Sequence, residues 1–147
     1  MSINERPLIV MSCSQVKKQT TKPMPFAEVY DGPIWQQVKK HWPSSHIAVL
    51  SAEHGLLEPG TEIMPYDRLM DEDRLLHILN DEKQMEKFAE LVRQYGKVIV
   101  VGGELYKLFA LYFTSIMYPE LGDRVHFACG SYLQQRGALG TLFQQAA

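Results

Sequence analysis

The chain has 147 residues, of which 46% are hydrophobic and 22% charged, and its formal net charge is −2. This length suits one domain, residues 1–147, with a single core, and the composition is that of an ordinary globular protein. The slightly negative charge excludes a strongly basic protein. A nucleic-acid-binding function would therefore need a local basic patch.

The cysteine content and the apolar segments restrict the class further. Cys13 and Cys129 lie far apart and in no metal-binding spacing, which predicts neither a disulfide framework nor a metal site. The apolar run near the N-terminus is too short for a signal peptide, and no stretch approaches the roughly 20 apolar residues of a membrane span. We expect a cytoplasmic protein, a monomer or small homo-oligomer, that needs no metal or cofactor and no membrane.

The first half of the chain predicts two strands separated by a loop and a helix. Residues 7–11 (PLIVM) form a continuous apolar run, typical of a strand buried on both faces of a parallel sheet. A polar loop follows at 12–25, and a proline at the first position indicates a helix at 33–40. A second strand is predicted at 46–50. Residues 51–70 are predicted to be a long, irregular but ordered segment, and such segments are usually functional.

The second half alternates helices and strands. Residues 71–95 carry apolar side chains at helical spacing. A break is expected at Asn80 and Asp81, where Asp81 would cap a second helix, and Gly96 would end that helix. The remaining elements are predicted as a strand at 97–101, a helix at 104–118, a strand at 125–129 and a helix at 132–145.

This order of elements predicts an α/β fold, a three-layer αβα sandwich around a mostly parallel four-stranded sheet. Ligands of such sheets bind beyond the carboxyl ends of the strands. Each predicted strand is followed at once by small or polar residues. These residues are Ser12-Cys13-Ser14, Ser51 to Gly55, Gly102-Gly103 and Gly130-Ser131. The four segments therefore predict one site at one edge of the sheet.

Glu53, His54 and Asp67 are the candidate catalytic residues. Glu53 or His54 could act as general acid or base, since histidine titrates near neutral pH. The alternative is a turn in which His54 caps a neighbouring carbonyl and Gly55 takes a positive φ. Asp67 could position water or stabilise a cation while Tyr66 stacks on a base. Asp67 could instead cap the helix that begins near residue 70.

The other strand ends supply candidate binding residues. Ser12, Cys13 and Ser14 with Lys17 could cradle an anion, although Cys13 is equally suited to burial as a small apolar residue. The basic runs Lys17-Lys18, Lys22 and Lys39-Lys40-His41 could form one patch or simply be solvated surface.

The two later strand ends add glycines, amides and an arginine. Gly102 and Gly103 would let a ligand approach the backbone at the helix N-terminus near Tyr106, or would merely allow close strand–helix packing. Amide side chains can read base edges and a guanidinium can grip phosphate, or they can form a polar helix face. The residues after the last strand are Gly130, Ser131, Gln134, Gln135 and Arg136.

Several motifs together resemble a family of small bacterial and phage domains, and more distantly the YaaA peroxide-stress proteins. The motifs are MSCSQVKK, VYDGPIW, LSAEHGLLEP, MPYD, GGELY and GSYLQQR. A segment reading like LSGLYGLL-P…PY stands in the YaaA proteins where this chain has LSAEHGLLEPGTEIMPY. The segment 50–67 is the most specific part of the likeness.

The resemblance implies the α/β fold of uracil-DNA glycosylases and a link to DNA with damaged or modified bases. Its motifs carry Ser12, Glu53, His54, Tyr66, Asp67, Tyr106 and Arg136. This chain departs from the glycosylase pattern, in which a GQDPY-type motif follows the first strand. Here Pro65-Tyr66-Asp67 follows the second strand.

From these features we expect a DNA glycosylase acting on a modified or damaged base, in stress response or antiphage defence. That chemistry needs a pocket for a flipped base and a carboxylate near the sugar, since the transition state resembles an oxocarbenium ion. One alternative is a non-catalytic, YaaA-like DNA-binding stress protein. The other is an enzyme of free nucleosides or nucleotides, which fits the net charge of −2 better.

Overall fold

The computed structural model describes residues 6–14 and 17–146, so residues 15 and 16 of the predicted loop lie outside it. All four predicted strands are confirmed to within one residue. They are β1 (Leu8–Ser12), β3 (Ile47–Ser51), β6 (Val98–Gly102) and β7 (Val125–Cys129). Neighbouring strands among these four run parallel, in the order β3-β1-β6-β7. The fold is therefore α/β, as predicted.

The sheet has five strands rather than the predicted four. The fifth, β4 (Gly55–Leu57), pairs antiparallel with β3 at the edge of the sheet. It lies in the segment 51–70, which also contains β5 (Glu62–Ile63), paired with β2 (Met24–Pro25) in a separate two-stranded sheet. The prediction of an irregular segment was wrong there, because strands of two or three residues are too short to show a period. The hairpin does need Gly55, which has a φ of 75°.

The predicted helices are also present. They correspond to α2 (Pro33–His41), α3 (Glu72–Leu79), α4 (Glu82–Tyr95), α5 (Glu104–Tyr112) and α6 (Tyr132–Ala146), and the structure adds the unpredicted α1 (Phe26–Val29). Three further helical turns are η2 (Ser44–His46), η3 (Phe113–Met117) and η4 (Pro119–Arg124). The predicted helix at 104–118 thus ends as the π-helical turn η3.

The break between α3 and α4 follows from two aspartate caps. Asp81 accepts a hydrogen bond from the Lys83 backbone N–H at 3.0 Å, as expected from the sequence. Asp71 caps α3 by accepting from the Arg74 N–H at 2.8 Å. The cap of α3 is therefore Asp71 and not Asp67.

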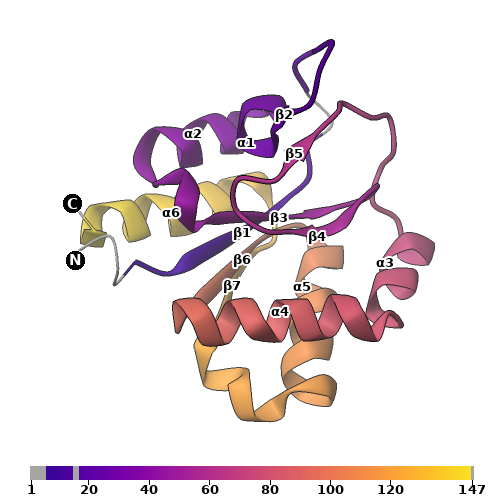
Figure 1. The fold of residues 1–147 in the computed structure, drawn as a ribbon. Coiled ribbons are helices and arrows are strands. Elements are labelled where there is room, and N and C mark those ends of the chain that lie inside the picture. The colour runs from indigo at the N-terminus through magenta and orange to yellow at the C-terminus, as the bar shows by residue number, and fades with distance from the viewer. Residues whose placement is uncertain (1–5, 15–16, 147) are drawn as a thin grey trace.

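Helices cover both faces of the sheet (Figure 1). Successive residues of β1 point to opposite sides, so Leu8 and Val10 pack with α3, α4 and α5, whereas Ile9 and Met11 pack with α1, α2 and α6. All four side chains are fully buried. This explains why the strand reads as an unbroken apolar run instead of an alternating one.

Gly96 ends α4 in the left-handed region, with a φ of 78°. Alanine in that conformation brings its Cβ against the following carbonyl, so Gly96→Ala is expected to lower the free energy of unfolding by about 1–2 kcal/mol. Urea denaturation measures the change. Gly96→Asn is the matched control, because asparagine tolerates this conformation better and should cost less. Equal stability of the alanine variant and the unchanged protein would contradict the prediction.

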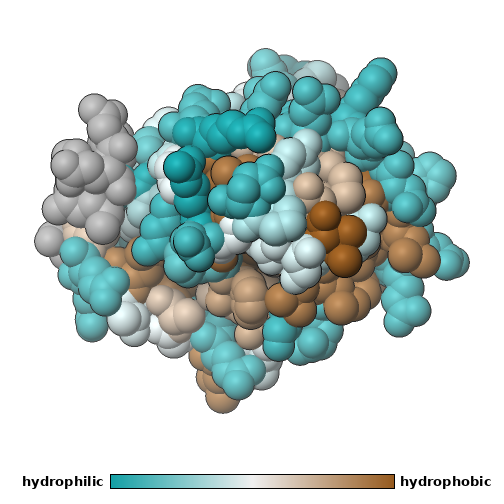
Figure 2. All heavy atoms as spheres, turned by 90° about the horizontal axis from the view of Figure 1, so that it is seen from below, coloured by the Kyte–Doolittle hydropathy of each residue, from teal (hydrophilic) through white to brown (hydrophobic). Residues whose placement is uncertain are grey.

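The face seen from below in Figure 2 carries apolar side chains at its surface. Large exposed apolar residues on α3, α5 and η3 are Leu76, Leu108, Leu111 and Ile116. Within the described part of the chain, no helix has the length and apolar character needed to cross a membrane.

Candidate functional site at the carboxyl edge of the sheet

The order in which the chain adds strands to the sheet reverses between β1 and β6, which makes this position a topological switch point. From β1 the chain passes through α2 to β3 on one side, and from β6 it passes through α5 to β7 on the other. Residues of α2 and α5 belong to cores on opposite faces of the sheet. The carboxyl ends of the two strands therefore flank the kind of opening in which α/β proteins bind ligands.

A crevice of about 190 Å³ lies at this point. Its lining residues are Cys13, Ser14, Arg68, Leu69, Met70 and Tyr106. Cys13 and Ser14 follow β1, Tyr106 comes from the first turn of α5, and residues 68–70 complete the lining. Three residues predicted from the strand ends thus meet in one place.

Tyr106 fixes the β6 side of the crevice. Its hydroxyl lies 3.2 Å from the Cys13 thiol, at hydrogen-bonding distance. Burial, and next the adjacent Cys13, raise the pKa of Tyr106, so its phenol stays protonated and can donate a hydrogen bond. Gly102 makes room for this ring, because a Cβ at Gly102 would lie 2.6 Å from the ring atom Cγ of Tyr106.

A cluster of three hydroxyl groups lies next to the crevice. Ser51 Oγ donates to Tyr66 Oη at 2.8 Å, and Tyr66 Oη lies 2.6 Å from Tyr30 Oη. Burial raises the pKa of Tyr30 to about 12 and also raises that of Tyr66. Both phenols are therefore neutral at physiological pH and cannot serve as bases. The sequence prediction included Tyr66 but missed Tyr30, which stands inside the motif VYDGPIW.

Lys17 and His54 both contact the ring of Tyr66. Lys17 Nζ lies 4.4 Å from the ring centroid of Tyr66, a cation–π contact. The imidazole of His54 meets the same ring edge-on, with centroids 5.4 Å apart. The backbone N–H of His54 donates to Ser51 Oγ at 3.1 Å. Tyr66 therefore links the end of β3 with the segment that follows β1.

The two candidate carboxylates differ in their surroundings. Glu53 Oε2 lies 3.8 Å from Nη1 of Arg68, which lines the crevice, so this carboxylate is at the rim. Arg74 holds the turn in place by donating to the backbone oxygens of Ala52 and Glu53. Asp67 is exposed and forms no hydrogen bond or ion pair with any described residue. Neither arginine was predicted, although Arg68 directly follows the predicted pair Tyr66 and Asp67.

The side chains of Gln134 and Gln135, at the start of α6, form hydrogen bonds to the backbone of the residues just before them. Gln134 Oε1 accepts from the Ser131 N–H at 2.9 Å, and Ser131 Oγ accepts from the Gln134 N–H at 3.3 Å, which is a capping box. Gln135 is buried and donates to the Gly130 carbonyl at 3.0 Å. Neither amide lines the crevice.

The remaining predicted residues are placed around these elements. The Ser12 carbonyl accepts from Trp35 Nε1 at 2.9 Å, so Ser12 anchors α2 to β1. Gly103 occupies the N-cap position of α5 and has open space around its Cα. Arg136 lies against Tyr132, between α6 and α2. Among the described residues, no group of three or more histidine, cysteine or acidic side chains is arranged to hold a metal ion.

Fold and crevice define an α/β protein with a small, partly aromatic crevice at the switch point of a mostly parallel sheet. A family model matches residues 8–118, and the chain therefore belongs to that family, described as a family of unknown function (DUF6884). No curated protein and no solved structure matches the chain. The matched range contains every residue that lines the crevice, whereas α6 lies outside it.

Proposed function

We propose that the protein is a nucleobase-directed hydrolase, a DNA glycosylase that cleaves the N-glycosidic bond of a modified or damaged base. The observation that carries the proposal is the crevice itself, with a phenol on one side and a carboxylate–arginine pair at its rim. Its volume of about 190 Å³ is below the roughly 300–1,000 Å³ of sites for drug-sized ligands. A single base is the size of group that it suits.

In this proposal, the base leaves the stack and enters the crevice beside Tyr106. The oxygen of a water molecule bonds to the sugar carbon C1′ as the bond between C1′ and the base nitrogen breaks. The Glu53 carboxylate takes the proton of this water and stabilises the cationic sugar in the transition state. His54 supplies the proton that the departing base accepts. The neutral hydroxyl groups of Tyr106 and Ser14 read the edge of the base.

A uracil-DNA-glycosylase-like form of the fold belongs to the same proposal. A parallel sheet with helices on both faces and a site at its carboxyl edge supports it. The resemblance to the YaaA peroxide-stress proteins supports a role in stress response or in defence against phage DNA with modified bases.

The second candidate is an enzyme that hydrolyses free nucleosides or nucleotides. The formal net charge of −2 supports it, because an enzyme of free nucleosides need not hold a polyanionic strand. Carboxylates repel a polyanionic strand more than they repel a neutral nucleoside.

The test is incubation of the purified protein with genomic DNA from phages that carry natural or modified bases. Mass spectrometry detects free bases, and alkaline cleavage detects abasic sites. We expect released bases in equal number to new abasic sites. Release from free nucleosides alone would favour the second candidate. Binding of DNA without any base release would overturn both in favour of a non-catalytic DNA-binding protein.

A further inference from the structure

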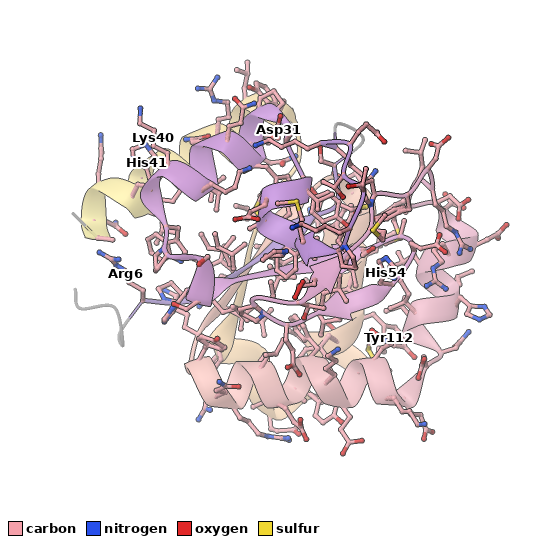
Figure 3. All side chains as sticks on the ribbon, turned by 45° about the horizontal axis from the view of Figure 1, so that its top comes forward. Arg6, Asp31, Lys40, His41, His54 and Tyr112 are labelled. Atoms are coloured by element: carbon pink, nitrogen blue, oxygen red, sulfur yellow. The ribbon has the colours of Figure 1, made fainter. Side chains whose placement is uncertain are left out.

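A groove of about 430 Å³ lies between α2 and α6, outside the crevice. It is lined by Pro33, Gln36, Gln37, Lys40, His41, Tyr132 and Arg136. None of these lining residues is acidic, although the whole chain has a net charge of −2. In Figure 3, Lys40 and His41 stand out from α2 on the side of the molecule away from His54. The α2–α6 groove is therefore a local basic surface.

The two permanent cations of the groove are not neutralised by the described part of the chain. Lys40 forms no ion pair or hydrogen bond there, whereas its neighbour Lys39 donates to the Tyr30 carbonyl at 3.1 Å and lies 3.9 Å from the Asp31 carboxylate. Arg136 donates through Nη1 to Tyr132 Oη at 3.3 Å. This contact orients the guanidinium and leaves its other N–H groups for a ligand.

Both helices of the groove begin near the crevice. Gly32, the N-cap of α2, lies so close to Ser14 that a Cβ there would be 2.6 Å from Ser14 Oγ. On the other side, the Gly130 N–H, just before α6, donates to the Gly102 carbonyl at 3.2 Å. Gly102 in turn packs against Tyr106. α2 thus begins next to Ser14, which lines the crevice, and α6 begins next to a residue that packs against the crevice residue Tyr106.

We propose that the α2–α6 groove holds the phosphodiester backbone of a single nucleic-acid strand whose displaced base occupies the crevice. This rests on the proposed function and extends it from the base to the strand. Arg136 offers a planar fork of N–H donors to one phosphate, and Lys40 offers a point charge to another. The half-exposed ring of Tyr132 can stack on a neighbouring base, as in other grooves that track single strands.

The experiment measures binding of fluorescent DNA and RNA strands of about 12 nucleotides, within the range of about 4–16 known for single-strand sites. The strands contain only natural bases, so that binding is recorded without cleavage. Fluorescence anisotropy is followed over a series of salt concentrations. We expect the double variant Lys40→Ala/Arg136→Ala to bind about 10- to 100-fold more weakly at low salt. Its plot of log affinity against log salt should be shallower by about 1.4, because each phosphate contact contributes about 0.7.

The matched control is Lys83→Ala/Arg124→Ala, which removes the same two kinds of charge from α4 and η4 and should bind like the unchanged protein. A preference for DNA or RNA identifies the sugar. Absence of binding to both strands, or equal weakening in the control, overturns the proposal. Base release is measured separately. Binding that depends on Lys40 and Arg136 without any base release would contradict the glycosylase function but would still support the groove as a binding site for a single strand.

Discussion

Replacement of Glu53 by glutamine is expected to lower the rate of base release about 100- to 10,000-fold, the usual contribution of a positioned acid–base group. Glutamine keeps the size of the side chain but can neither accept the proton of water nor stabilise a cationic sugar. The contact with Arg68, at 3.8 Å, lies between two exposed side chains. Its loss should therefore change the free energy of unfolding by less than about 1 kcal/mol. Single-turnover release followed by mass spectrometry measures the rate, and urea denaturation the stability.

Glu58→Gln is the matched control, because Glu58 is an exposed carboxylate just beyond β4 that does not line the crevice. It should keep the full rate. Asp67→Asn separates the two candidate carboxylates. If Asp67→Asn lost activity while Glu53→Gln kept it, Asp67 and not Glu53 would be the catalytic carboxylate. Full activity in both variants would remove the carboxylate from the mechanism and with it the assignment as an N-glycosidic hydrolase.

The central sheet could be predicted because burial on both faces leaves a mark in the sequence. Each parallel strand packs one set of side chains under each helical layer, so every position is apolar, as in Leu8 to Met11. The edge strand β4 leaves no such mark. Its three residues are ordered by hydrogen bonds to β3, from a hairpin that Gly55 permits. Tertiary pairing and not local preference makes it a strand.

The candidate site divides in the same way. Cys13, Ser14 and Tyr106 were predictable because they follow strand ends, and the topology of a parallel sheet brings strand ends together. Arg68 reaches the crevice from a segment whose path depends on β4 and β5. Tyr30 reaches the neighbouring hydroxyl cluster from the end of α1, a helix of four residues that is too short to show a period. Contacts made by such short elements are not encoded in a local pattern.

The amides after β7 show a different limit. The pattern Gly130-Ser131-Tyr132-Leu133-Gln134 is compatible with base recognition and with a helix cap, and the two uses compete for the same atoms. In the structure, the Gln134 amide oxygen is taken by the Ser131 N–H. Unsatisfied N–H groups at a helix N-terminus cost free energy wherever no ligand is bound. Gln134 therefore caps α6 and its amide oxygen is not free to read the edge of a base.

Gly102→Ala is expected to destabilise the protein by about 1–3 kcal/mol, the usual cost of overpacking a filled interior. The added Cβ would lie 2.6 Å from Cγ and 2.8 Å from Cβ of Tyr106. These atoms are near the backbone and cannot swing aside, so the whole side chain must move. Its hydroxyl would then lose the contact with the Cys13 thiol, now 3.2 Å away. Urea denaturation measures the stability, and mass spectrometry of alkylated peptides measures the reactivity of Cys13, which should rise.

The adjacent glycine supplies the control. Gly103→Ala places its Cβ in open space at a φ of −83°, so it should leave both the Tyr106 ring and the alkylation of Cys13 unchanged. The pair of variants separates the crevice from the general stability of the strand–helix junction. If Gly102→Ala also abolished base release while Gly103→Ala retained it, the position of Tyr106 would be tied to activity. Unchanged stability and unchanged Cys13 reactivity in Gly102→Ala would contradict the packing that forms the β6 side of the crevice, and the site would have to be sought elsewhere along the carboxyl edge.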